Sequence, residues 1–144
     1  MANVERDLAH KIIEHTHTNL FLTGRAGTGK TTFLRQLREE SHKRMVVLAP
    51  TGIAAINAGG VTIHSFLQLP FGMYIPGSRF SNEQFRFSNR KRKLIRSLDL
   101  IVIDEISMVR ADLLDCMDAA LRRLRTDPRQ IGRASCRERV CLYV

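Results

Sequence analysis

A glycine-rich segment near the N-terminus ends in a lysine followed by two threonines. It reads GRAGTGKTT, from Gly24 to Thr32, and has the spacing of a glycine, four residues, and then Gly-Lys-Thr. Glycines here let backbone N–H groups approach phosphate oxygens, and the positive end of a following helix adds to the attraction. In such loops the lysine reaches the β and γ phosphates, whereas the alternative is a plain glycine turn between strand and helix. The predicted nucleotide-binding residues are Gly24, Gly27, Thr28, Gly29, Lys30, Thr31 and Thr32.

Two adjacent carboxylates end a second apolar run, LIVIDEISM. If this run is a buried strand, Asp104 and Glu105 lie at the carboxyl edge of the sheet, where ligands bind in folds of this class. Asp104 is then placed to hold Mg²⁺, and Glu105 to polarise the water that attacks the γ-phosphate. An acid pair could instead begin a turn or cap a helix. Together with the glycine loop, the pair predicts nucleotide hydrolysis, with Lys30 and Glu105 as catalytic residues and Thr31 and Asp104 as metal ligands.

The elements that must position these residues are indicated by alternating strand and helix patterns. Three runs, NLFLT, RMVVLAP and LDLIVIDE, are apolar enough to be strands covered on both faces. Helical spacing predicts a short helix from Val4 to Ile13, a helix that opens at Gly29 to Thr31, and a last helix over about 111–125. Prolines and glycines from Pro70 to about Ser88 indicate a long loop. The pattern predicts an α/β fold with a mainly parallel sheet.

Composition restricts the class of protein. A chain of 144 residues with 44% hydrophobic residues can build one domain with a real core. The formal net charge of +9 favours an anionic partner such as nucleic acid, although the basic run 90–93 is more typical of a solvated surface than of direct contact. No apolar run reaches the roughly 20 residues that span a bilayer, and the start of the chain lacks a secretory signal, so we expect a cytoplasmic protein without membrane association. The three cysteines, Cys116, Cys136 and Cys141, lack the paired spacing of a zinc site.

Three segments carry the two nucleotide motifs and two further motifs between them. They read FLTGRAGTGKTTFLRQL, MVVLAPTGIAAINAGGVTIHSFLQLPFG and LIRSLDLIVIDEISMVRADLLDCMDAALRRLR. Together, from about Leu20 to Arg125, they resemble the first motor domain of PIF-type DNA helicases, in the superfamily-one group that includes RecD-like enzymes. The resemblance implies a three-layer RecA-like P-loop NTPase domain, incomplete at its C-terminus. It also implies ATP and Mg²⁺ as cofactors and single-stranded DNA as the partner, along which motors of this family move from 5′ to 3′.

The resemblance assigns the segments between the nucleotide motifs to DNA. APTGIAA matches the family's first DNA-contacting motif, so Pro50, Thr51 and Gly52 would lie beside the sugar–phosphate backbone. A hydroxyl and main-chain N–H groups at a helix start suit such contacts. TIHSF matches a further DNA-proximal motif with His64 and Phe66, where an aromatic ring could stack on a base. The alternatives are a core position for Phe66 and a structural hydrogen-bonding role for His64.

After RTDPRQ the sequence departs from the family. We expect a partial motor domain over residues 1–128 and an unrelated basic tail over 129–144, which looks like a frameshift or read-through. The missing second motor domain would supply an arginine finger, which can raise the rate of hydrolysis by roughly 10³- to 10⁵-fold. We therefore expect little activity and no unwinding by this chain alone.

A sheet of this kind also needs a further strand between the glycine-loop strand and the acid-pair strand. VCLYV, Val140 to Val144, has strand-like composition and could fill that gap, although neither its register nor its length evolved for that position. We therefore expect a loose or aggregation-prone product.

Two other functions stay open. One is an AAA-type ATPase or helicase loader, which would lack the TIHSF segment and would need to oligomerise. The other is a non-enzymatic, basic nucleic-acid-binding fragment, whose DNA binding would not depend on Lys30.

The family's adenine-contacting glutamine is not found before the glycine loop, so phosphate binding is better indicated than base specificity.

Overall fold

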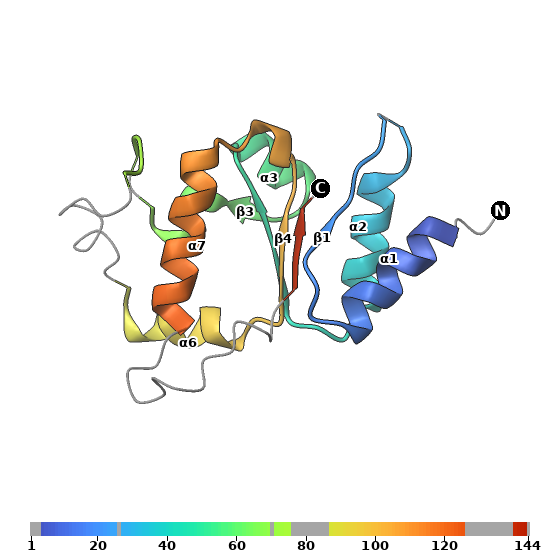
Figure 1. Cartoon of the computed structure of the whole chain (residues 1–144), viewed down its shortest axis with the longest axis horizontal. Helices are drawn as coiled ribbons and strands as arrows, with labels where there is room; N and C mark the ends of the chain where they lie inside the picture. The colour runs from blue at the N-terminus through green and yellow to red at the C-terminus, as the bar shows by residue number, and fades with distance from the viewer. Residues whose placement is uncertain (1–3, 26, 70, 76–86, 126–139, 144) are drawn as a thin grey trace.

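The computed structural model describes residues 4–25, 27–69, 71–75, 87–125 and 140–143. Figure 1 shows three layers, with the sheet between α1 and α2 on one side and α6 and α7 on the other. The strands are β1 (Leu20–Phe21), β2 (Met45–Ala49), β3 (Val61–Thr62), β4 (Leu100–Ile103) and β5 (Val140–Tyr143). The helices are α1 (Val4–His15), α2 (Lys30–Glu40), α3 (Gly52–Asn57), α4 (Ile63–Leu67), α6 (Asn89–Ser97) and α7 (Ala111–Arg125), with a 3₁₀ turn η1 (Ile106–Met108) before α7.

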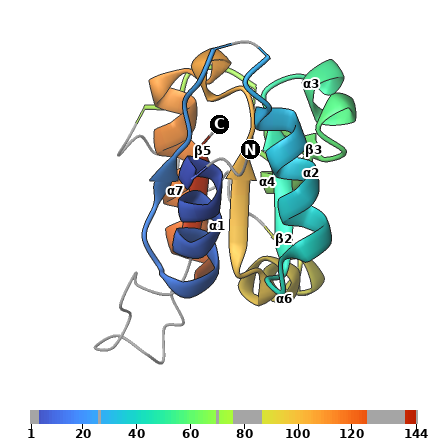
Figure 2. The same cartoon turned by 90° about the vertical axis from the view of Figure 1, so that its right-hand side faces the viewer.

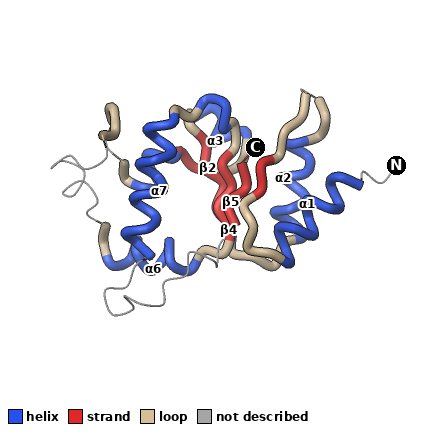
Figure 3. The backbone as a smooth tube through the Cα atoms, viewed as in Figure 1, coloured by secondary structure: helices blue, strands red, loops and turns tan. Residues whose placement is uncertain are grey.

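The described sheet is parallel throughout, which confirms the predicted fold class. Its strand order is β1-β5-β4-β2-β3, and Figure 3 shows the strands side by side between the two groups of helices. β5 lies between β1 and β4, with Leu142 opposite both Leu20 and Val102. Val140–Tyr143, from the segment VCLYV, therefore supply the strand that the sheet needs between its glycine-loop strand and its acid-pair strand.

Alternation along β4 divides the core into two halves. Leu100 and Val102 pack with α1 and α2, whereas Ile101 and Ile103 pack with α4, α6 and α7. All four side chains are buried, as expected for a strand covered on both faces. No helix in the described ranges is long and apolar enough to cross a membrane.

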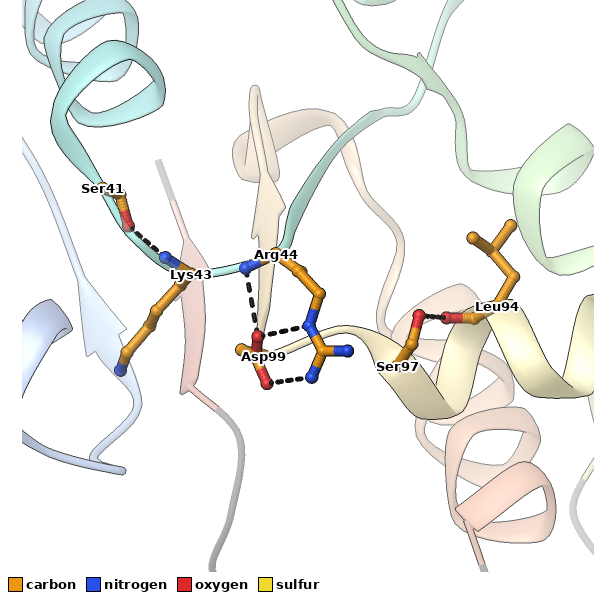
Figure 4. Close-up of polar contacts among 6 residues, drawn as sticks. All are labelled: Ser41, Lys43, Arg44, Leu94, Ser97 and Asp99. Carbon is orange, nitrogen blue, oxygen red and sulfur yellow. Dashed lines mark hydrogen bonds and ion pairs between the residues drawn. The ribbon is translucent and has the colours of Figure 1, made fainter.

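Polar contacts align β2 and β4 where these strands begin. Arg44 donates from Nε and Nη2 to the two carboxylate oxygens of Asp99, over 2.9 and 3.1 Å, and its backbone N–H donates to the same carboxylate (Figure 4). In return, the backbone N–H groups of Asp99 and Leu100 donate to the Arg44 carbonyl oxygen. The side chains are well exposed, so the ion pair adds little to stability. Its role is to fix where the two strands start relative to each other.

Candidate nucleotide and nucleic-acid site

The candidate residues leave the sheet at the carboxyl ends of its strands. The glycine loop follows β1, the acid pair follows β4, Thr51 follows β2 and His64 lies in the helix after β3. Because the strands are parallel, these segments meet at one edge. Figure 2 shows the glycine loop before α2 and the start of α3 at this edge, with α6 at the opposite one. The strand order puts the glycine loop at one end of the edge, the acid pair in the middle and His64 at the other end.

Backbone conformation explains the glycines of the loop. Gly27 and Gly29 have φ angles of 80° and 86°, in the left-handed region that residues with a Cβ rarely adopt. Gly24 is restricted by space instead, because a Cβ there would lie 2.6 Å from the Thr28 hydroxyl oxygen. That hydroxyl donates to the Arg25 carbonyl oxygen over 2.8 Å and braces the turn.

Lys30 is the first residue of α2 and bends back over the loop. Its ammonium group donates to the carbonyl oxygens of Gly24, over 2.6 Å, and Arg25, over 3.2 Å. Gly29 is the N-cap of α2, and within the described residues no side chain caps this helix start. The first amide groups of α2 and the positive end of its dipole are therefore directed at the loop.

The first turn of α2 also exposes Thr31 and Thr32 beside the loop. The opposite side of the helix is buried through Phe33, Leu34 and Leu37, which pack with α1 and the sheet. This amphipathic packing fixes the direction in which the start of α2 points.

The acid pair continues directly from β4. The backbone N–H of Asp104 donates to the Leu48 carbonyl oxygen over 2.9 Å, so the ladder with β2 extends to this residue. The Asp104 carboxylate in turn accepts a 2.9 Å hydrogen bond from the N–H of Glu105. Glu105 has φ 55° and ψ 44°, an uncommon conformation for a residue with a Cβ, and is the N-cap of η1. Such conformations are concentrated at functional sites.

Strand register places the glycine loop and the acid pair at the same height. Phe21, the last residue of β1, and Ile103, the last of β4, are both opposite Tyr143 of β5. Neighbouring strands lie about 4.8 Å apart, so the two strand ends are separated by about 10 Å. The structure therefore brings the predicted phosphate-binding and carboxylate residues to one edge, with a single strand between them.

The predicted DNA-contacting segment after β2 starts a helix. Thr51 is the N-cap of α3, and its hydroxyl oxygen accepts a 3.2 Å hydrogen bond from the N–H of Ala54. Thr51 and Gly52 are exposed, whereas Pro50 is partly buried. The structure thus leaves a hydroxyl and a helix start accessible where the sequence predicts contact with a sugar–phosphate backbone.

The TIHSF segment does not present the aromatic ring that the sequence singles out. Phe66 is only 8% exposed and packs in the core with α7, and the Lys91 ammonium group lies 4.1 Å from its ring centroid. This burial favours the core alternative for Phe66 over base stacking. His64 is partly exposed and stacks on Phe71, with ring centroids 5.1 Å apart and planes 12° from parallel.

Phe71 is a candidate residue that the motif analysis misses. Its side chain is 90% exposed. The one available signal in the sequence is an aromatic residue between a proline and a glycine, in the loop that follows TIHSF. The basic run 90–93, by contrast, lies in α6 at the opposite edge of the sheet (Figure 1). Three of its cations are exposed, as expected for a solvated surface, whereas Lys91 is partly buried over Phe66.

Comparison with known proteins decides the family. A sequence profile described as PIF1-like helicase matches residues 2–133. The chain belongs to the PIF1-like helicase family. It is 35% identical over 136 residues to the ATP-dependent DNA helicase PIF1 of Saccharomyces cerevisiae, a match that covers 89% of this chain and 15% of the yeast protein. It is 40% identical over 108 residues to the ATP-dependent DNA helicase Pif1 of Bdellovibrio bacteriovorus, covering 74% of this chain and 24% of that protein.

Solved Pif1 structures match the fold over nearly the whole chain. Pif1 from a Bacteroides species in complex with ADP-AlF4 matches with a TM-score of 0.83, and Bacteroides Pif1 bound to ssDNA matches with a TM-score of 0.81. Both are 43% identical, and each match covers 99% of this chain and 32% of the solved chain. The PIF-type resemblance and the RecA-like fold are thereby confirmed. The chain spans a quarter or less of these two curated PIF1-like relatives, and the boundary at residue 128 and the nature of the tail stay predictions.

Proposed function

We propose that this chain is the ATP-binding part of the motor in an ATP-dependent DNA helicase that moves from 5′ to 3′ on single-stranded DNA. The observation that carries the proposal is the meeting of the glycine loop and the acid pair at one sheet edge, one strand apart. The names of the PIF1-like relatives and the Pif1 complex with ADP-AlF4 support it.

The geometry of the glycine loop fits a triphosphate. Two left-handed glycines open the backbone, and an 11-residue helix begins there without a side-chain cap among the described residues. The Lys30 ammonium group is held by two neutral carbonyl oxygens, which phosphate oxygens can replace with stronger, charge-assisted hydrogen bonds. Lys30 thus binds the β and γ phosphates of ATP and stabilises the charge that develops on them.

Mg²⁺ fits the donors at the same edge. The Thr31 hydroxyl and the Asp104 carboxylate are oxygen donors, and Mg²⁺ is usually held by one or two protein oxygens together with phosphates and water. When bound, Mg²⁺ neutralises charge on the phosphates during transfer. Glu105 is exposed beside Asp104, and its carboxylate orients and deprotonates the attacking water.

Single-stranded DNA is the proposed partner at the far end of the edge. Thr51, Gly52 and Pro50 contact the sugar–phosphate backbone, and His64 lies beside them at the end of the neighbouring strand, because Ala49 and Thr62 are opposite each other. The Bacteroides Pif1 structure bound to ssDNA supports this assignment. We also propose that an arginine finger from a second motor domain completes the ATPase site, so that this chain alone binds ATP but turns it over slowly.

The test is nucleotide-dependent thermal stability of the wild-type chain and of Lys30→Ala, with a non-hydrolysable ATP analogue and Mg²⁺. A ligand at 100 times its Kd adds about 2.7 kcal/mol to the free energy of unfolding, which raises Tm by several degrees. We expect this shift in the wild type and its loss in Lys30→Ala, because the ammonium group contacts the phosphates.

Arg35→Ala is the matched control, because Arg35 is an exposed cation on the same helix. It removes the same charge and should keep the wild-type shift. Equal shifts in the wild type and Lys30→Ala, or no shift in either, would contradict the proposal and favour a nucleic-acid-binding fragment that does not use nucleotide.

A further inference from the structure

The aromatic ring of Phe71 is exposed near His64, at the carboxyl edge of the sheet. Phe71 is 90% exposed, and the ring of His64 stacks against it at 5.1 Å. Met73 and Ile75, in the same short segment, are also exposed. An aromatic ring that is backed by a second ring and otherwise open to solvent is shaped to receive a further flat group.

A second contact fixes the segment that carries Phe71. The backbone N–H of Tyr74 donates to a carboxylate oxygen of Asp112 over 3.2 Å, and Arg110 donates to both oxygens of that carboxylate over 2.9 Å. The hydrogen bond from Tyr74, more than any other contact, holds the pKa of Asp112 below its usual value. The carboxylate is therefore charged at neutral pH and keeps accepting both sets of hydrogen bonds. The segment is anchored to α4 through His64 and to the start of α7 through Asp112.

The anchored ring stacks on His64, which follows β3, the strand beside the one that leads to the predicted backbone-contacting helix start. His64 and Thr51 each stand two residues beyond paired positions, Thr62 and Ala49, at the ends of neighbouring strands about 4.8 Å apart. Proteins that bind single-stranded nucleic acid combine contacts to the sugar–phosphate backbone with aromatic rings on which bases stack. Thr51 supplies the first kind of contact, and Phe71, which stacks on His64, supplies the second from the end of the neighbouring strand.

We propose that Phe71 stacks on an unpaired base of single-stranded DNA, with His64 supporting the opposite face of its ring. The inference rests on the proposed function, because it requires DNA to pass along this edge. Stacking on a ring face does not distinguish among the bases, so the contact would act on any sequence, as a motor that moves along DNA requires. The fixed position of the ring lowers the cost of ordering it on binding.

The experiment is fluorescence anisotropy with two labelled oligonucleotides of about ten residues, one of thymidylate and one abasic with the same backbone. The wild-type chain should bind the thymidylate strand more tightly. Phe71→Ala should weaken that binding by about 5- to 150-fold, the range for loss of one stacked base, and should leave the abasic strand unaffected. Phe71→Tyr should retain the preference for bases, and Phe71→Leu should lose most of it.

Met73→Ala is the matched control, since Met73 is another exposed apolar residue two positions away. It should bind both strands as the wild type does, and Tm of each variant shows that the fold is intact. Equal weakening on both strands in Phe71→Ala, or none on either, would overturn the stacking role while leaving the proposed function in place. Failure of the wild type to bind either strand would overturn the DNA part of the proposed function, and this inference with it.

Discussion

At the scale of single residues, the backbone conformation of Glu105, the proposed catalytic carboxylate, lowers the stability of the fold. Its left-handed backbone turns the chain out of β4 and into η1, at a cost of roughly 1–2 kcal/mol for a residue with a Cβ. Neighbouring contacts hold it there: its N–H donates to the Asp104 carboxylate, and its carbonyl oxygen accepts from Met108 in η1. Hydrogen bonds at both ends of the turn therefore offset part of the cost of this backbone conformation.

This cost predicts that glycine at position 105 is more stable than alanine, the reverse of the usual order. Both Glu105→Ala and Glu105→Gly remove the carboxylate, but only glycine adopts the left-handed conformation without strain. We expect Glu105→Gly to be more stable than Glu105→Ala by about 1 kcal/mol, even though glycine has the more flexible unfolded state. Urea unfolding of the two variants measures the difference. An alanine variant at least as stable as the glycine variant would show that the backbone at this position is not strained.

At the scale of elements, the turn between α3 and β3 is built around close contact with β2. A Cβ at Gly60 would overlap the carbonyl oxygen of Val47, so no side chain fits there. The N–H of Gly60 donates to the Ala55 carbonyl oxygen at the end of α3, and Arg38 of α2 donates to the Gly59 carbonyl oxygen over 2.7 Å. The last turn of α2 thus contacts the segment that connects α3 to β3.

Gly60→Ala should therefore destabilise the protein. The added methyl group meets backbone rather than a movable side chain, so we expect a loss of about 1–3 kcal/mol in the free energy of unfolding. Gly52→Ala, in the first turn of α3, is the matched control, because nothing lies within 4 Å of a Cβ there and alanine favours helix by up to about 1 kcal/mol. Chemical denaturation of both variants checks the prediction. Similar stability of the two variants would mean that the turn can move away from β2.

The strands beside the motifs and the helix α7 could be predicted from the sequence, but β3 and α4 could not. α7 has the predicted bounds because fifteen residues contain enough turns to repeat an apolar stripe. β3 has two residues and α4 has five, too few for any period to show. The candidate nucleotide site could be proposed from the sequence because its chemistry fixes residue type and spacing. The burial of Phe66 and the exposure of Phe71 depend on tertiary packing, which a local pattern does not contain.

At the scale of the whole molecule, β5 joins the two halves of the candidate nucleotide site. It pairs with β1 on one side and β4 on the other, so its backbone lies in the interior of the sheet. Without it, the glycine-loop strand would have no partner in the described sheet.

Leu142→Pro should therefore abolish the cooperative fold. Proline removes a backbone N–H donor and does not fit an interior strand, which costs about 3 kcal/mol or more. Leu142→Val is the control, because it keeps the N–H group and has high strand propensity. We expect a cooperative thermal transition in the valine variant and none in the proline variant, as followed by circular dichroism. A proline variant that melts like the wild type would show that β1 is stabilised without β5.

The position of β5 also sets the order in which the protein can assemble as it is made. β1 and the glycine loop leave the ribosome early, but the strand that joins them to β4 begins at Val140. At about 5–20 residues per second, the wait between them is on the order of ten seconds. Throughout that time β1 has unpaired backbone groups that other chains can bind, and one side of β4 joins it for the last part of the wait. A nascent chain of this topology therefore benefits from protection by chaperones until β5, the strand between β1 and β4, is synthesised.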